Sequence, residues 1–274
     1  MNRTRISRRT FVQGAAGVVS LAAVAACASD NKTAGTSASS EVAATIGLQP
    51  ETPATAAPVP VETQPATTPA PAPGSPAQFI DHGPETVNNV ALTFHLSGDW
   101  KIASHLLDLL RDRATAVTVF IVGTFANDNP KLTARIVAEG HELANHTQNH
   151  HPMRTLSRSQ IADEITKGGE SITPFIGNQG HWFRPSGIVV PTDTILEEAG
   201  KAGYQVSVGY SLDTDDYQDP GAKHVLAKVR DEAKAGSIIS VHFGHQGTID
   251  AMPNILDHLS SVGLTPVTVS TLLA

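Results

Sequence analysis

The chain has 274 residues, including 18 prolines and 12 histidines, and a formal net charge of −7 at neutral pH. Nine prolines and no aromatic residue fall within residues 28–78, whereas all of the histidines come later. This distribution predicts an N-terminal region that cannot bury a core, followed by one domain at residues 79–274 that is long enough to do so. The acidic balance argues against nucleic acid as a partner, because nucleic-acid binding needs a basic face.

Residues 1–27 have the features of an export signal. Arg8 and Arg9 form a twin-arginine pattern, and the apolar stretch of ~16 residues that follows is too short and too weakly apolar to span a bilayer. Small residues then precede Cys27, as in a bacterial lipobox. We predict a twin-arginine lipoprotein signal peptide, a lipid on Cys27 and a location on the outer face of the bacterial cell membrane, with the lipid as the contact with the membrane. An ordinary signal peptide with a chance cysteine is the alternative.

Residues 28–78 are rich in proline, alanine, threonine and serine. Such a composition predicts a disordered, semi-extended linker with an end-to-end distance of about 40 Å or more. A domain tethered in this way would reach the polymer that lies just outside the membrane. Because Cys27 is the one cysteine of the chain, no internal disulfide is possible.

The histidine-rich part alternates between short apolar runs and stretches of helical periodicity. Ser157 and Gln160 have the spacing of a capping box at the start of a helix. Predicted strands are residues 90–94, 116–122, 141–145, 182–184, 205–212, 237–243 and 266–269, and predicted helices are residues 102–110, 130–138, 157–172, 192–202, 222–235 and 255–259. Strands that alternate with helices pair in parallel, so the expected fold is a single α/β domain, a distorted barrel of the (β/α)7 type.

Polar residues follow five of the predicted strands, where the chemistry of a β/α barrel is found. They are His95, His146, His150, Arg184, Asp213, Asp216 and His242. Taken singly, each also fits a structural role: a surface arginine before a turn, a solvated acidic loop, a histidine within the core. The four-residue spacing of His146 and His150 would aim both rings at one point on a helical turn, as a two-histidine metal site requires.

In their order, these motifs resemble the polysaccharide deacetylases of carbohydrate esterase family four, the NodB homology domain. The segments that carry the resemblance are residues 93–99, 146–150, 183–187, 213–217 and 239–242. The resemblance implies a divalent metal, zinc, on His146 and His150, which would activate a water for attack on an N-acetyl group.

The resemblance also implies roles for the remaining polar residues. His242 would be the general acid and Asp216 the carboxylate that orients it. Arg184 would orient the base. Trp182 and Tyr217 would offer flat faces to a sugar ring.

The first motif departs from the family, which has two aspartates where this chain has His95 and Leu96. In one alternative Asp99 is the carboxylate ligand of the metal and His95 the catalytic base. In another, His95 is the third metal ligand and Asp99 the base. Both keep three ligands and an open position for water. In a third, the site binds glycan without cleaving it.

The sequence therefore predicts a metal-dependent hydrolase that removes acetyl groups from a cell-surface glycan, peptidoglycan or a related N-acetylhexosamine polymer. A catalytically inactive, glycan-binding lipoprotein on the same fold is the rival hypothesis. A solute-binding lipoprotein is a weaker alternative, because two lobes need more chain. The sequence does not predict the oligomeric state.

Overall fold

A computed structural model describes residues 74–97 and 100–274. The predicted signal peptide, Cys27, most of the predicted linker and Asp99 lie outside the described residues. Within those that are described, no helix is both long and apolar enough to cross a membrane.

One curled sheet forms the centre of the domain, and all of its strand pairs are parallel. The strand order is β1-β6-β5-β4-β3-β2-β8-β7, and β9 pairs with β2. The strands are β1 (Gln78–Ile80), β2 (Asn89–Leu96), β3 (Thr118–Ile121), β4 (Glu142–Asn145), β5 (Trp182–Phe183), β6 (Val206–Val208), β7 (Leu212–Asp213), β8 (Ile238–His242) and β9 (Thr265–Val267). This arrangement confirms the predicted α/β barrel architecture.

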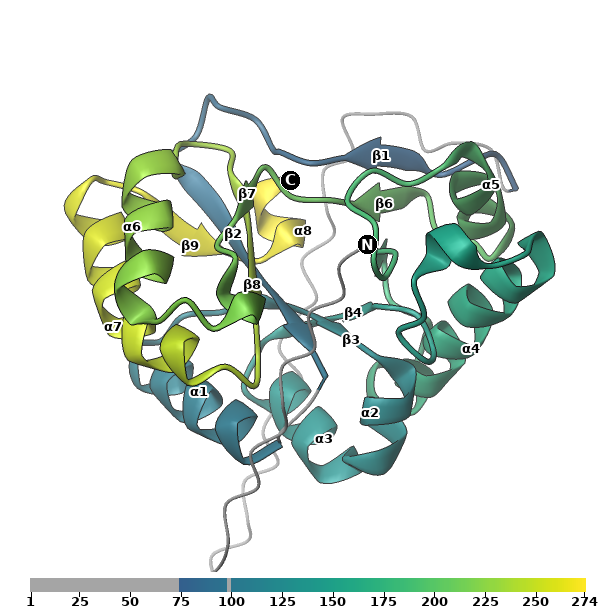
Figure 1. Cartoon of the computed structure of the whole chain (residues 1–274), viewed down its shortest axis with the longest axis horizontal. Coiled ribbons are helices and arrows are strands. Elements are labelled where there is room, and N and C mark those ends of the chain that lie inside the picture. The colour runs from purple at the N-terminus through teal and green to yellow at the C-terminus, as the bar shows by residue number, and fades with distance from the viewer. Residues whose placement is uncertain (1–73, 98–99) are drawn as a thin grey trace, which may run out of the picture. The chain divides into compact units, whose positions relative to one another are not determined.

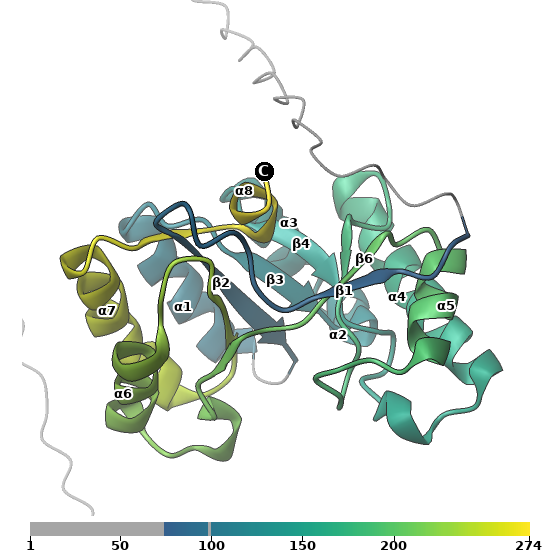
Figure 2. The same cartoon turned by 90° about the horizontal axis from the view of Figure 1, so that it is seen from above.

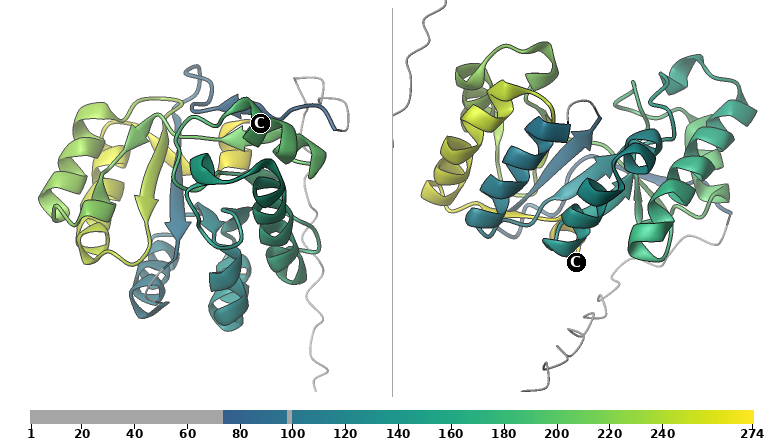
Figure 3. Two further views of the ribbon diagram at one scale, coloured as in Figure 1. Left: turned by 45° about the vertical axis from the view of Figure 1, so that its right-hand side comes forward. Right: turned by 90° about the horizontal axis from the view of Figure 1, so that it is seen from below.

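Helices cover the outside of the sheet, with α6, α7 and α1 on one side and α4 and α5 on the other (Figure 1). The view from above (Figure 2) and the views turned by 45° and from below (Figure 3) show the same arrangement. The α-helices are α1 (Trp100–Asp112), α2 (Gly123–Asp128), α3 (Pro130–Ala138), α4 (Arg158–Ile176), α5 (Asp193–Lys201), α6 (Ala222–Glu232), α7 (Gln246–Ser261) and α8 (Val269–Leu272). Two 3₁₀ turns, η1 (Met153–Thr155) and η2 (Asp216–Gln218), lie in the loops.

Alternation along β2 separates the outer core from the inside of the barrel. Val90, Leu92, Phe94 and Leu96 belong to the large apolar cluster between sheet and helices. The residues between them point the other way, and Ala91 joins the smaller inner cluster. His95 and Leu96 stand where the family that the sequence resembles has two aspartates. The side chain of His95 therefore faces the inside of the barrel, and that of Leu96 faces the outer core.

Several element boundaries differ from the prediction. The predicted strand 205–212 is divided into β6 and β7, and the pairing of β6 with β1 ends at the bond from the Gly209 N–H to the carbonyl of Ile80. Strand β1 begins inside the predicted linker and is held by parallel pairing with β6. The capping box at Ser157 and Gln160 is confirmed at the start of α4. The shorter elements α2 and α8 were not predicted.

Candidate active site

The carboxyl ends of the strands surround a pocket of about 620 Å³. His95 and His242 are paired in the register of β2 and β8, and their ring centroids lie 4.6 Å apart. His146, just beyond β4, stacks on His95 at 4.5 Å, and His150 lies 5.0 Å from His146. The fold thus brings together four histidines from segments that are far apart in the sequence.

Arg184, at the end of β5, lies beneath these rings and is almost completely buried. Its guanidinium donates to the carbonyl oxygens of Val208 and Gly209, at 2.9 and 2.8 Å, and to the hydroxyl of Thr93 at 3.0 Å. Its Nη1 also lies 3.2 Å from Nε2 of His95. These four acceptors are all neutral, and burial lowers the pKa of Arg184 to about 9.

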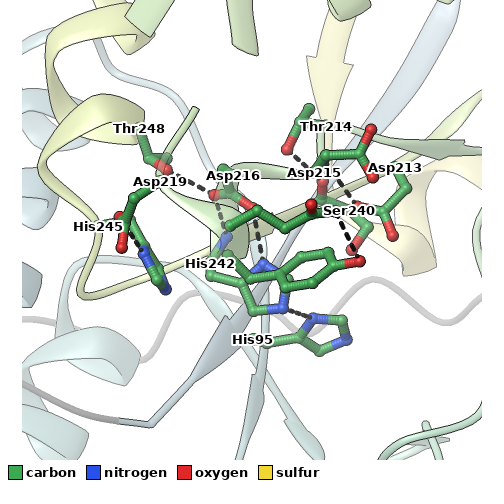
Figure 4. Close-up of polar contacts among 12 residues, drawn as sticks. His95, Asp213, Thr214, Asp215, Asp216, Asp219, Ser240, His242, His245 and Thr248 are labelled. Carbon is green, nitrogen blue, oxygen red and sulfur yellow. Dashed lines mark hydrogen bonds and ion pairs between the residues drawn. The ribbon is translucent and has the colours of Figure 1, made fainter. Parts of the chain in front are cut away.

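A hydrogen-bonded chain runs from Arg184 through two histidines to Asp216. Because a guanidinium can only donate, Nε2 of His95 accepts, and the proton of a neutral His95 ring is on Nδ1. That proton faces Nε2 of His242 at 2.9 Å, and His242 Nδ1 in turn donates to Asp216 Oδ1 at 2.7 Å. Figure 4 shows the links from His95 through His242 to Asp216. The bonds all point the same way, from Arg184 toward Asp216.

Electrostatics reinforce this assignment. Burial is the main reason that the pKa of His95 falls well below its usual value, and the neighbouring His146 and Arg184 lower it further. Burial and the nearby His150 likewise lower the pKa of His146. The rings of His95 and His146 therefore stay uncharged at neutral pH.

Asp216 holds His242 by two bonds and is itself held by a third. Its Oδ2 accepts from the backbone N–H of His242 at 2.7 Å and from the hydroxyl of Thr248 at 2.5 Å. Burial alone would raise the pKa of this carboxyl, but the bonds from His242 and Thr248 keep it below its usual value. Asp216 is thus an ionised group that orients one ring nitrogen of His242, while the other faces Nδ1 of His95.

The loop after β4 presents His146 and His150 without the helical turn that the spacing suggested. Thr147 and His150 have left-handed backbone angles, with φ of 67° and 60°. His146 Nδ1 donates to the carbonyl oxygen of Arg184 at 2.8 Å, so its Nε2 carries the lone pair. This is the arrangement of an imidazole prepared to bind a metal.

Comparison with known proteins adds to this geometry. Residues 82–207 match the family model described as polysaccharide deacetylase. The chain is 32% identical over 196 residues to a peptidoglycan-N-acetylglucosamine deacetylase of Bacillus cereus, an alignment that covers 69% of this chain and 91% of the relative. The chain belongs to the polysaccharide deacetylase family.

Two further relatives of this deacetylase family show its range. The peptidoglycan-N-acetylmuramic acid deacetylase PdaA of Bacillus subtilis is 26% identical over 179 residues, which cover 64% of this chain and 68% of PdaA. A solved structure of a BA3943 mutant from Bacillus anthracis, described as a family four pseudoenzyme with restored enzymatic activity, is 25% identical with a TM-score of 0.68 and covers 73% of this chain and 72% of its own. The family therefore contains hydrolases of amide bonds and members that have lost activity.

Deacetylases of this family generally depend on a metal ion. Within the described part of this chain, no three His, Cys, Asp or Glu side chains are grouped so that they could hold one. His146 and His150 supply two imidazoles, but both nitrogens of His95 face other partners. Leu96 is buried in the outer core. The described residues therefore do not complete a three-ligand site, and the proposed ligand Asp99 lies outside them.

Trp182 does not line this pocket of four histidines, the histidine pocket, contrary to the role we expected for it. It lines a separate pocket of about 500 Å³ with Gln179 and Gln205, and its indole donates to Glu142 at 2.7 Å. Trp182 lies two residues before Arg184, which places it one layer lower in the barrel. Tyr217, by contrast, lines the histidine pocket and is half exposed.

We predict that Trp182→Phe leaves the affinity for glycan within about twofold of the original value and destabilises the fold by about 1–2 kcal/mol, because the Glu142 carboxylate loses a donor. Tyr217→Ala should have the opposite profile, with weaker glycan binding and an unchanged fold. Calorimetric titration and urea unfolding of both variants test this pair. Weaker binding by the Trp182 variant would restore the role that the sequence suggested.

Other residues of the site carried no signal in the sequence. Thr248 supports Asp216 from the first turn of α7, and Tyr210 packs beside Arg184 at 5.3 Å. Arg154 lines the pocket from η1. Thr248 lies in the part of α7 that precedes the helix predicted at residues 255–259, and Tyr210 lies between β6 and β7, where one continuous strand was predicted. Only the packing shows that both residues face the site.

Proposed function

We propose that this chain hydrolyses the N-acetyl groups of a cell-surface glycan, peptidoglycan or a related N-acetylhexosamine polymer, with His242 as the general acid. The observation that carries this proposal is the Asp216–His242 pair at the mouth of a pocket. A buried carboxylate stabilises the imidazolium that forms when Nε2 of His242 takes up a proton. The relatives that act on peptidoglycan support the choice of substrate class.

In the proposed reaction, the attacking water loses a proton and the departing amine gains one. Nε2 of His242 is well placed for both transfers, because Asp216 holds the ring by Nδ1. When Nε2 is protonated it can no longer accept from His95, so the ring of His95 has to turn or release its own proton. His95 acts as a base only after its bond to Arg184 breaks, and the role of Asp99 as base or ligand stays a prediction.

The metal requirement belongs to the same proposal. His146 and His150 would be two ligands of a zinc ion and Asp99 the third, since both nitrogens of His95 are engaged. When bound, such an ion polarises a carbonyl group and makes a water molecule more acidic. The twin-arginine signal, the lipid on Cys27 and the location at the outer face of the membrane remain proposals from the sequence.

A second candidate function is glycan binding without hydrolysis. It is favoured by the incomplete ligand set among the described residues and by the likeness to a family member described as a pseudoenzyme. In that case the pocket would hold an N-acetylated sugar, and the hydrogen bonds that link Arg184, His95, His242 and Asp216 would serve only to hold the lining side chains in place.

The experiment that separates the two measures acetate release from N-acetylglucosamine oligomers and from peptidoglycan, with chelator and with zinc restored. We expect His146→Ala to abolish both acetate release and zinc binding, because a buried metal-binding nitrogen is lost. His151→Ala is the matched control, since this neighbouring histidine is exposed and lies outside the pocket lining. Acetate release that survives His146→Ala would refute the role of the metal. Glycan binding by the unmodified chain without acetate release would establish the second candidate.

A further inference from the structure

Two arginines and one aspartate line the histidine pocket, although the chain as a whole is acidic. The charged residues that line it are Arg154, Arg184 and Asp213. Asp216 lies behind His242, and its two oxygens already accept three donors. Asp213 is therefore the one carboxylate residue among these lining residues, against two arginines.

The unusual first motif leaves Arg184 without a carboxylate among its hydrogen-bond partners. All four of its hydrogen bonds end on neutral acceptors, and the side chain is 2% exposed. A carboxylate in place of His95 would neutralise the guanidinium directly, whereas an imidazole with its lone pair toward Arg184 does not. A buried cation without a counter-ion is costly, and an anionic group nearby relieves that cost.

Arg154 adds a second, exposed cation at the same pocket. Its backbone is fixed, because the side chain of Met153 is buried and the Met153 N–H donates to the carbonyl of Ser186 at 3.1 Å. The arginine side chain itself has no ion pair among the described residues, whereas the nearby Arg158 contacts both Glu197 and Glu198. Arg154 is therefore held at the rim of the pocket and is available to a ligand.

Another part of the rim is apolar. Val189, Val190 and Tyr217 are among the most exposed large apolar side chains of the described chain, at 45%, 61% and 50%. All three line the pocket. Such a surface suits the carbon–hydrogen faces of sugar rings, so the pocket combines a platform for sugar with a cationic edge.

We propose that the glycan held in this pocket carries a carboxylate, and that Arg154 is the residue that selects it. This inference rests on the proposed function of the pocket as a glycan site and narrows its substrate class. A sugar of the N-acetylmuramic acid type, whose lactyl ether bears a carboxylate, has the required chemistry. A neutral polymer of N-acetylglucosamine does not. The guanidinium of Arg154 pairs with the carboxylate, and the charge of Arg184 favours it from below.

The test compares three tetrasaccharides by calorimetric titration on the full chain. One contains only N-acetylglucosamine, one alternates N-acetylglucosamine with peptide-free N-acetylmuramic acid, and the third is the second with each carboxylate converted to an amide. We expect the acid to bind about fivefold more tightly than its amide, and the ratio to fall as salt is raised. Arg154→Gln should bring the ratio to about one and leave the affinity for the amide unchanged.

Arg230→Gln is the matched control, because Arg230 is also exposed, has no ion pair in the described structure and lies on α6, outside the pocket lining. This variant should keep the fivefold ratio. Equal binding of acid and amide by the unmodified chain, or a ratio unchanged by Arg154→Gln, would overturn the inference and leave the proposed function intact. Absence of binding to all three glycans would refute both.

Discussion

Asp216→Asn should reduce the turnover number for acetate release by about 10³-fold. The carboxylate accepts three donors, whereas an asparagine offers one acceptor oxygen and an NH₂ group. If the amide oxygen keeps the backbone N–H of His242, the NH₂ group meets Nδ1 and drives the proton of the ring to Nε2. On Nε2, this proton would face the Nδ1–H of His95. One substitution would thus disturb the whole series of hydrogen bonds back to Arg184.

Two measurements check this result: the steady-state rate of acetate release and the ¹⁵N chemical shifts of the histidine rings, which report the tautomer of His242. Asp219→Asn is the matched control, because Asp219 pairs with His245 in the same way at 2.8 Å but is largely exposed. It should change the rate by less than about twofold. A rate in the Asp216 variant equal to that of the unmodified chain would show that the oriented histidine takes no part in the reaction.

The sequence alone could predict that the side chains of the site lie close together, because the parallel arrangement of the strands determines it. His95 and His242 follow strands that the sequence placed correctly, and adjacent parallel strands deliver their last residues to one edge. Arg184 was predicted by the same reasoning. None of these predictions required knowledge of side-chain packing.

The finer geometry could not be predicted, for physical reasons that differ between residues. Residues 90–94 are buried on both faces, so their apolar run contains no alternation to show that His95 points inward and Leu96 outward. Trp182 points to the same side of the sheet as Arg184, but the layer of the barrel interior in which it lies depends on the register of the strands. The division of the strand at residues 205–212 depends on contacts with β1 and Arg184, which use the backbone of Val208 and Gly209.

The free energy of unfolding should fall by about 3 kcal/mol between pH 6.5 and pH 5 on account of His95 and His146, in the presence of chelator. His95 and His146 keep pKa values well below the usual range in the folded chain, mainly because they are buried. In the unfolded chain both take up protons below about pH 6.5. The unfolded state then binds more protons than the folded one, so their contribution is fully present above that pH and is lost as the pH falls. Each histidine contributes up to about 1.4 kcal/mol per pH unit over that window.

Urea unfolding at pH 7, 6 and 5 measures this dependence, and the chelator prevents the release of a metal from being read as protonation. The double variant His95→Gln, His146→Gln is the decisive comparison, because amides do not titrate but still donate and accept hydrogen bonds. Its stability should depend less steeply on pH than that of the unmodified chain, although not vanishingly so, since His141 and His150, whose pKa values are also lowered, still titrate. The lowered pKa of Asp216 affects stability only near and below pH 4 and does not enter this window. If the free energy of unfolding depends on pH equally steeply in the double variant and in the unmodified chain, these two rings become charged in the folded state. A charged His95 could not accept a hydrogen bond from Arg184, so the series of hydrogen bonds described above would be wrong at that residue.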